Sequence, residues 1–215
     1  MDKQPVRRPA LPAVGSTLIA AMALFAGVAT AVRSDAAAPQ SPLAAQLLHD
    51  PHTQVLGNVR GDVTVVEFFD YACPTCKATE PRVEALLKAD RNVKLVAKEF
   101  PVLSPESVIA SKAALAAARQ GKYSAFHQAL LSHRGGLDEA TIFAVAQDVG
   151  LDVARLRKDM TTPEISDEIA ANLKLAHAIH VPGTPTFIVA GHMLTQPASS
   201  IDFPAVVAAA RHGAA

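Results

Sequence analysis

Cysteine is scarce in this sequence, and there is no excess of charge of either sign. The 215 residues include only two cysteines, Cys73 and Cys76, and 20 basic residues balance 20 acidic ones. A small secreted domain built on a disulfide scaffold normally needs four or more cysteines, and a disulfide across so short a loop would constrain the unfolded chain little. A nucleic-acid binder would show a basic patch or stripe. The sequence therefore argues against both classes of protein.

The first 38 residues have the pattern of an export signal. Basic residues occur at Lys3, Arg7 and Arg8, and residues 9–32 carry no charge. An apolar stretch within this segment is followed by small residues, as in a cleaved secretory signal, but it is also just long enough for an uncleaved membrane anchor. We expect residues 1–38 to be a signal peptide or an anchor, with cleavage favoured, and the rest of the chain to be exported.

The next part of the chain predicts a β-α-β unit. Residues 39–60 are expected to be a linker with a short N-terminal helix. The β-branched and aromatic run 63–69 predicts a buried strand, 73–90 a helix and 93–100 a second strand. Such a unit has parallel strands, and both cysteines would lie at its strand-to-helix turn.

A block of helices is expected to interrupt the sheet. Capping residues, glycines and prolines divide residues 104–180 into five helices. Two strands, at 186–190 and 193–196, and a final helix at 202–211 then follow. We therefore expect an α/β fold in which residues 61–103 and 181–215 form one domain and residues 104–180 an inserted helical domain.

A Cys-x-x-Cys pair at the start of a helix favours redox chemistry. Unpaired backbone N–H groups and the helix dipole stabilise an anion there, which lowers the pKa of the first thiol. Cys73, at the exposed end, would be the attacking thiolate, and Cys76, which faces inward, would resolve the mixed disulfide. Pro74 suits an early helical position because its missing N–H loses nothing there.

A metal site is the alternative interpretation of the two thiols. Zinc would normally bring a second Cys-x-x-Cys or a pair of histidines, and His177 and His180 have the wrong spacing for this. A thiolate pair suits Cu(I) better. No metal ligand is assigned, and a copper-binding or copper-tolerance module remains as an alternative.

A second motif lies immediately before the strand at 186–190. Pro185 in the run Gly183-Thr-Pro-Thr-Phe187 is a candidate cis-proline, because cis peptide bonds are nearly confined to X-Pro. A proline at this point would expose the backbone of Thr184, which could pair with an extended substrate segment by strand addition.

Three motifs together resemble the DsbA-like family of bacterial periplasmic thiol–disulfide oxidoreductases, and its Com1-type branch above all. They are Glu67-Phe-Phe-Asp-Tyr-Ala-Cys-Pro-Thr-Cys-Lys77, Lys98-Glu-Phe-Pro101 and Gly183-Thr-Pro-Thr-Phe187. The resemblance implies a thioredoxin fold with an inserted helical domain. It also implies that Cys73 is the nucleophile, Cys76 the resolving thiol and Pro185 the cis-proline beside them.

The resemblance also implies a cellular setting. No organic cofactor is expected. The partners would be unfolded or cysteine-containing exported proteins, together with a membrane redox partner that resets the cysteines. The protein would act in the periplasm, free or tethered to the inner membrane by an uncleaved N-terminal segment.

Glu67 is a candidate for proton transfer. It lies six residues before Cys73, where thioredoxin-like proteins commonly place a buried acid. A carboxylate inside an apolar strand needs a partner or a raised pKa. Lys98 on the neighbouring strand is the expected partner, and the two could relay a proton to and from Cys76. A salt bridge without a catalytic role is the alternative.

Thr75 departs from the pattern of the strongly oxidising family members, which carry a histidine between the cysteines. The pKa of Cys73 should therefore be less depressed, and the potential nearer the about −180 mV of protein disulfide isomerase than the about −120 mV of DsbA. Thr184 also resembles the isomerase and reductase members. Dedicated isomerases, however, usually have a dimerisation domain, for which residues 39–60 are too short.

Oxidation of exported proteins is the favoured function. Isomerisation or reduction, and a catalytically silent scaffold on the same fold, are the alternatives besides copper binding. Pro74, Thr75 and Thr184 are expected to contact the substrate. Asp70 and Tyr71 are expected to shape the rim of the site, and His127 and His133 to lie on the surface.

Overall fold

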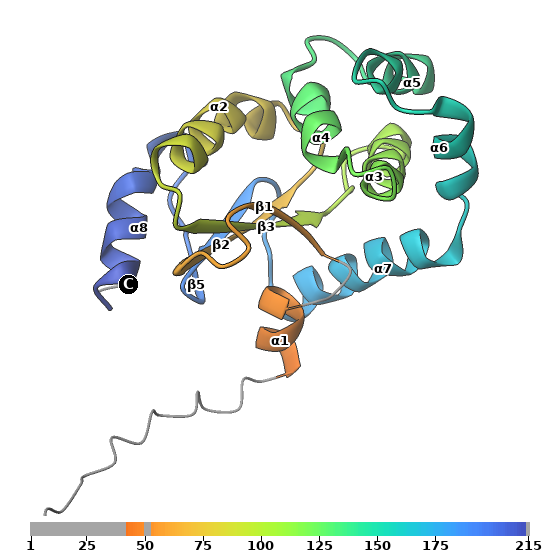
Figure 1. Cartoon of the computed structure of the whole chain (residues 1–215). Helices are drawn as coiled ribbons and strands as arrows, with labels where there is room; N and C mark the ends of the chain where they lie inside the picture. The colour runs from red at the N-terminus through yellow and green to blue at the C-terminus, as the bar shows by residue number, and fades with distance from the viewer. Residues whose placement is uncertain (1–41, 50–52, 214–215) are drawn as a thin grey trace, which may run out of the picture. The chain divides into compact units, whose positions relative to one another are not determined.

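A five-stranded mixed sheet forms the centre of the molecule (Figure 1). The computed structural model describes residues 42–49 and 53–213, so the expected export segment lies outside the described residues. The strands are β1 Gln54–Gly57, β2 Val63–Phe69, β3 Val93–Glu99, β4 Thr186–Val189 and β5 His192–Met193. Their order is β1-β3-β2-β4-β5; β2 and β3 are parallel, and the other neighbours are antiparallel.

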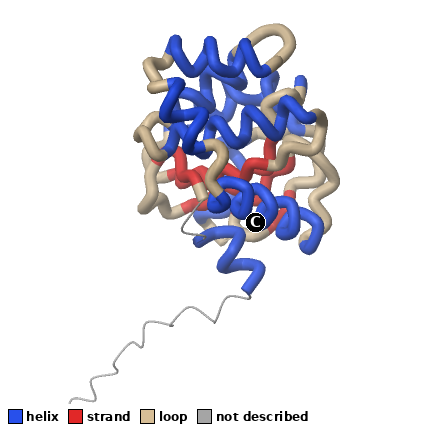
Figure 2. The backbone as a smooth tube through the Cα atoms, turned by 90° about the vertical axis from the view of Figure 1, so that its right-hand side faces the viewer, coloured by secondary structure: helices blue, strands red, loops and turns tan. Residues whose placement is uncertain are grey.

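Helices cover the sheet on both sides, as Figure 2 shows. They are α1 Pro42–His49, α2 Pro74–Ala89, α3 Pro105–Ala118, α4 Tyr123–Ser132, α5 Glu139–Asp148, α6 Val153–Asp159, α7 Pro163–Ala178, the 3₁₀ turn η1 Ala198–Ser200 and α8 Phe203–Arg211. The five helices α3 to α7 come between β3 and β4, which is the helical insertion expected from the sequence. The prediction of an α/β thioredoxin fold with such an insertion is confirmed.

The two faces of the sheet pack into separate apolar clusters, because successive side chains of a strand point to opposite faces. Val65 and Phe69 of β2 pack in the cluster that includes residues of α2, α3, α4 and α8. Val66 and Phe68, the residues between them, pack against α1 and α7. Both faces of β2 are buried, which explains its continuous apolar run.

Caps fix where the inserted helices begin. The Ser104 side chain accepts the Ser107 N–H at 3.2 Å, and Pro105 occupies the first turn of α3. Asp138 and Asp152 cap α5 and α6 in the same way. These side chains satisfy N–H groups that a helix start leaves unpaired, so the starts of these helices follow local chemistry that the sequence displays.

Strand β1 corrects one expectation. Residues 54–57 belong to the segment predicted as a linker, but they pair antiparallel with β3 at the edge of the sheet. Only Leu56 among them is buried. Four residues with a single buried side chain give too weak an alternation to identify from the sequence, and the strand depends on its partner. The last strand, β5, is also shorter than expected and lies at 192–193.

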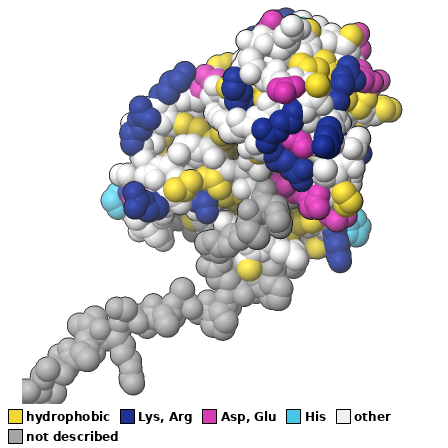
Figure 3. Space-filling model, turned by 45° about the vertical axis from the view of Figure 1, so that its right-hand side comes forward, with side chains coloured by type: hydrophobic (Ala, Val, Ile, Leu, Met, Phe, Trp, Pro, Cys, Tyr) yellow, Lys and Arg dark blue, Asp and Glu magenta, His cyan; other side chains and the backbone are white. Residues whose placement is uncertain are grey.

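Figure 3 shows one face of the molecule, on which no large patch of basic or of acidic side chains stands out among the described residues. This arrangement agrees with the balanced charge of the whole sequence. Within residues 42–49 and 53–213, no helix is long and apolar enough to span a membrane.

A substitution at Phe187 tests the packing of α8 against the sheet. It is 1% exposed, and its ring meets that of Phe203 edge-to-face with 4.9 Å between centroids. We expect Phe187→Ala to lower the free energy of unfolding by about 3–5 kcal/mol in urea titrations. Val59→Ala is the control, because Val59 is 67% exposed, and it should change stability by less than about 0.5 kcal/mol. Equal effects of the two substitutions would contradict the packing.

Candidate active site

The two cysteines lie at the start of α2. Cys73 is the N-cap, and its sulfur accepts the backbone N–H of Cys76 at 3.3 Å. Pro74 takes the first helical position, and the Cys73 N–H donates to the Asp70 carbonyl at 3.0 Å. The two sulfur atoms are not bonded to each other, and both cysteines are buried, with 4% of Cys73 and 1% of Cys76 exposed. Cys73 is thus more enclosed than the sequence suggested.

The surroundings separate the pKa values of the two thiols. Hydrogen bonding from the Cys76 side chain, helped by Thr184 and by the backbone N–H groups of Thr75 and Cys76, lowers the pKa of Cys73 to about 6 against the opposing effect of burial. Burial raises the pKa of Cys76 far above its ordinary value, and Cys73 and Glu67 add to this rise. Near neutral pH one sulfur is therefore a thiolate and the other keeps its proton.

The segment around Pro185 lies against the first cysteine. The Thr184–Pro185 peptide bond is cis, and the Sγ of Cys73 lies 3.4 Å from the carbonyl oxygen of Thr184. Strand β4 begins directly after Pro185 and pairs with β2, which leads into Cys73. Pro74 and Thr75 are exposed beside this contact. The residues expected to meet a substrate are thus brought together.

Glu67 is buried beneath the cysteines. It is 2% exposed in the middle of β2. Burial raises its pKa well above the ordinary value, and the nearby charges of Glu80 and Cys73 raise it further. Glu67 in turn raises the pKa of Cys76, so the carboxyl and the inner thiol interact across the core.

Lys98 is not where the sequence analysis placed it. In the parallel register Glu67 pairs with Ala97, whereas Lys98 pairs with Phe68. Side chains of adjacent residues point to opposite faces, so Glu67 and Lys98 face opposite sides of the sheet. Lys98 is fully buried and donates to the Gln46 carbonyl at 3.0 Å and to the Thr53 hydroxyl. The expected Glu67–Lys98 relay is wrong, and Lys98 instead bonds to the segment that contains α1.

Asp70 connects the active-site turn to two other segments. Its Oδ1 accepts the Ala72 N–H at 2.7 Å and the Ser107 hydroxyl at 2.6 Å. Its Oδ2 accepts the N–H groups of Val102 and Leu103 at 2.9 and 3.0 Å. The residue is fully buried. It therefore supports the turn before Cys73 from below. The expectation from the sequence that Asp70 shapes the rim of the site is wrong.

A buried polar cluster behind Asp70 escaped the sequence analysis. The Tyr71 and Tyr123 hydroxyls both donate to Glu99 Oε1, at 3.0 and 2.9 Å, and the Ser111 hydroxyl donates to Glu99 Oε2 at 2.7 Å. Tyr71 also lies 3.0 Å from Nδ1 of His127. His127 is 1% exposed, which corrects its expected surface position. Its spacing of four residues from Tyr123, on one face of α4, was the available signal.

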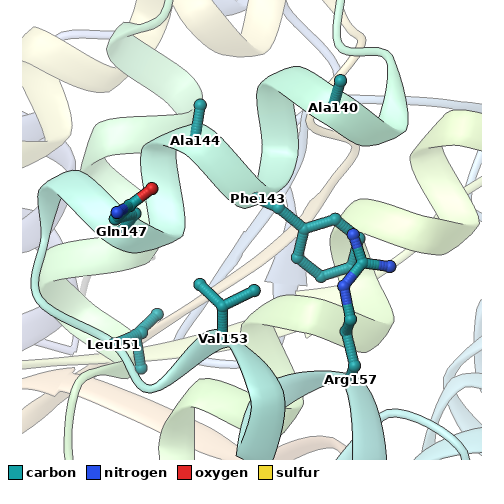
Figure 4. Close-up of a pocket in the computed structure, with 7 residues that line it drawn as sticks. All are labelled: Ala140, Phe143, Ala144, Gln147, Leu151, Val153 and Arg157. Atoms are coloured by element: carbon teal, nitrogen blue, oxygen red, sulfur yellow. The ribbon is translucent and has the colours of Figure 1, made fainter.

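No second site of comparable chemistry is found among the described residues. They include no group of three or more His, Cys, Asp or Glu side chains that could hold a metal ion. A hollow of about 480 Å³ lies on the inserted helices, lined by Ala140, Phe143, Ala144, Gln147, Leu151, Val153 and Arg157 (Figure 4). The Arg157 guanidinium lies over the Phe143 ring at 3.5 Å and pairs with Glu139. This hollow includes no residue of the dithiol site.

The sequence matches one family and several curated relatives. A family model described as the DSBA-like thioredoxin domain matches residues 64–205. The chain is 36% identical over 139 residues to the Na(+)/H(+) antiporter NhaA 1 of Salinispora arenicola, covering 64% of this chain and 21% of the antiporter. This chain thus spans about a fifth of the length of that relative. It is 30% identical over 176 residues to the thiol:disulfide interchange protein DsbA of Bordetella parapertussis, covering 72% of this chain and 82% of that protein.

Solved structures share the same fold. A thioredoxin-like oxidoreductase from Silicibacter pomeroyi superposes with a TM-score of 0.74 at 43% identity, over 78% of this chain and 97% of that chain. The thiol-disulfide exchange protein alpha-DsbA2 from Wolbachia pipientis gives a TM-score of 0.66 at 28% identity, over 70% and 82% of the two chains. Both structures therefore have the fold of this chain over most of their length.

Asp70 provides a test of the support beneath the site. We expect Asp70→Ala to lower the free energy of unfolding by about 3 kcal/mol or more, because buried N–H groups lose a charged acceptor. Asp138→Ala is the matched control, since Asp138 is exposed and accepts a single helix-capping bond from Thr141 at 2.7 Å. That control should cost about 1 kcal/mol. Urea unfolding of both variants measures the difference, and a smaller loss for Asp70→Ala would contradict its supporting role.

Cys73 provides a pH test. Thiolate absorbance of the reduced protein should rise with a midpoint near pH 6 and show no second step from Cys76 up to pH 9, given a pKa of about 6 for Cys73 and the raised pKa of Cys76. A lowered thiol pKa stabilises the folded state above the unfolded pKa, and this gain is lost as pH falls through the folded value. The stability of the reduced protein relative to the oxidised one should therefore grow from pH 6 to pH 9. A midpoint near 8.5, the value of free cysteine, would contradict this result.

Proposed function

Because this chain belongs to the DSBA-like thioredoxin domain family, we propose that it exchanges disulfides with cysteine-containing exported proteins through Cys73 and Cys76, as an oxidase. The observation that carries the proposal is the position of Cys73 at the N-cap of α2, where its sulfur accepts the Cys76 N–H and lies against Thr184, while Cys76 is buried one turn further along. This arrangement separates the pKa values of the two thiols. A stabilised thiolate at Cys73 favours the reduced form of the pair, and a disulfide whose reduced form is stabilised is oxidising.

The reaction begins on the oxidised pair. A substrate thiolate attacks Cys73 Sγ, the Cys73–Cys76 bond breaks, and Cys76 leaves and takes up a proton. A second substrate thiolate then attacks the substrate sulfur of the mixed disulfide, and Cys73 leaves as a thiolate. The substrate gains a disulfide, and the two electrons remain on the cysteine pair. The low pKa makes Cys73 a good leaving group.

The surrounding residues position the substrate and the proton. The backbone of Thr184 beside Pro185 would pair with the extended substrate segment as an added strand, while the exposed Pro74 and Thr75 would meet it from the helix side. Glu67 is the candidate donor of the proton that Cys76 takes up, because the two groups interact electrostatically in the core.

The compartment and the partners follow from the same proposal. An oxidase needs an oxidising environment, and the Salmonella enterica relative with a TM-score of 0.70 and 26% identity is described as a periplasmic thioredoxin-like protein. We propose that this chain acts in the periplasm, where unfolded exported proteins would be its substrates. A membrane redox partner would reoxidise the pair. The competing reaction is isomerisation or reduction of substrate disulfides. Thr75 between the cysteines favours these reactions over oxidation of the substrate.

The redox equilibrium of the pair with glutathione, followed by thiol trapping, decides the direction. A potential above about −150 mV would mark a donor of disulfides, whereas a value below about −220 mV would exclude the oxidase and indicate an isomerase or a reductant. Cys76→Ser should accumulate a mixed disulfide with a model substrate, whereas Cys73→Ser should not. If neither variant formed a mixed disulfide, the exchange reaction itself would be excluded.

A further inference from the structure

Two buried polar side chains, Glu80 and His127, lie close together behind the dithiol. Oε2 of Glu80 and Nε2 of His127 have no hydrogen-bond partner among the described residues. Glu80 is 4% exposed and His127 is 1% exposed. The same Nε2 lies 4.0 Å from Oε1 of Glu80. Buried polar side-chain atoms are nearly always paired, so this unpaired acceptor and carboxyl require an explanation.

The hydrogen bonds of the cluster determine the tautomer of His127. Tyr71 has one hydroxyl proton and donates it to Glu99 Oε1 at 3.0 Å. Its oxygen can therefore only accept from Nδ1 of His127, 3.0 Å away. A proton on Oε2 of Glu99 would leave this pattern unchanged, since it would reverse only the bond with Ser111, and Oε1 would still accept from Tyr71 and Tyr123. In neutral His127 the proton is thus on Nδ1, and Nε2 is a bare acceptor.

The group that can supply a proton to this acceptor is the carboxyl of Glu80. We propose that Glu80 and His127 form a buried pair that holds a proton, and that the pair gains protons when the Cys73–Cys76 disulfide is reduced. This proposal rests on the proposed exchange reaction. Burial raises the pKa of Glu80 to about 8 and lowers that of His127 to about 3, so the proton resides on the carboxyl near neutral pH.

The pair is connected to the cysteines through α2 and β2. Glu80 lies four residues after Cys76, and both are buried on one face of α2. Glu67 on β2 interacts with both, because Glu80 raises the pKa of Glu67 and Glu67 raises that of Cys76. A new thiolate at Cys73 adds negative charge to this group and also raises the pKa of Glu67. After Glu67 has passed its proton to Cys76, it should therefore take up another, and reduction should favour protonation of the buried carboxyls.

The other titratable neighbours can be separated from Glu80. Glu84, one turn further along α2, raises the pKa of Glu80 but is partly exposed and pairs with Lys88. On the far side of His127 lie Tyr123, whose ring stacks on it, and Glu99, which is reached through Tyr71. The reacting sulfur atoms belong to the cysteines. His127 and Glu80 act on the reaction only through those cysteines, so they are positioning residues.

The number of protons taken up for each disulfide reduced is the quantity that tests the proposal. A substrate dithiol that becomes a disulfide loses two electrons and two protons. The cysteine pair accepts both electrons, but above the pKa of Cys73 it binds only one proton, at Cys76. A fraction of Glu80 that is ionised in the oxidised protein and protonated in the reduced one takes up part of the second proton. Proton uptake should therefore exceed one per disulfide in the pH range where Glu80 titrates, with a maximum near pH 8.

The experiment measures protons taken up per disulfide reduced as a function of pH, from the pH dependence of the glutathione equilibrium of the full chain. Wild-type protein should exceed one proton near pH 8, and Glu80→Gln should lose this maximum, whereas any uptake by Glu67, which the Cys73 thiolate also favours, would remain. His127→Phe keeps an aromatic ring but removes both ring nitrogens, including the acceptor for Glu80, so it should move the maximum to lower pH. Glu139→Gln, which changes an exposed carboxyl on α5, should match wild type. A Glu80→Gln profile equal to wild type, or an unchanged maximum in His127→Phe, would overturn the proposal.

Two measurements on the wild-type protein do not depend on the variants folding. Nitrogen NMR should find His127 neutral with its proton on Nδ1 in both redox states. Infrared difference spectra between chemically oxidised and reduced protein at pH 8 should show a gain of protonated carboxyl on reduction. An Nε2–H tautomer, or no carboxyl signal, would refute the pair. Because dithiothreitol reduces the pair and a chemical oxidant such as diamide oxidises it, both states can be prepared without glutathione, and failure to equilibrate with glutathione would count against the proposed function alone.

Discussion

The carboxylate of Asp70 joins three segments that are far apart in the sequence. It accepts hydrogen bonds from the turn before Cys73, from the loop after β3 at Val102 and Leu103, and from Ser107 in the first turn of α3. One buried anion thus fixes the active-site turn relative to the inserted helices. The position of the Cys73 sulfur depends on this arrangement, because the Asp70 carbonyl also receives the Cys73 N–H.

Buried acids beneath the dithiol make the site costly to maintain. The pKa values of Glu67, Glu80 and Glu99 are all raised by burial. Each carboxyl binds its proton more tightly in the folded chain than in the unfolded one, so the folded state loses stability as pH rises above the ordinary carboxyl range. The gain from Cys73 in the reduced protein runs in the opposite direction. The site therefore trades stability for control over where protons reside.

Much of the fold could be predicted from the sequence, because strong local signals mark it. The apolar run of β2, the capped helices and the cysteines at a helix start all depend on neighbours within a few residues. Lys98 could not be placed, because its face depends on the register between β2 and β3, and a shift of one residue reverses every side chain. β1 and His127 were missed for a related reason: both are defined by partners distant in the chain, Leu95 and Val96 opposite β1 and Tyr71 beside the histidine.

The contact between Cys73 and Thr184 has a consequence for turnover. The thiol form of Cys73 donates to the Thr184 carbonyl, which is part of the backbone that an extended substrate would use as a pairing edge. A sulfur that is a thiolate or part of a disulfide has no proton to donate, so the carbonyl is then free to pair with a docked strand. In the proposed reaction the substrate docks on the disulfide, where this condition is met. Protonation of the reduced Cys73 would restore the internal bond and occupy the pairing edge.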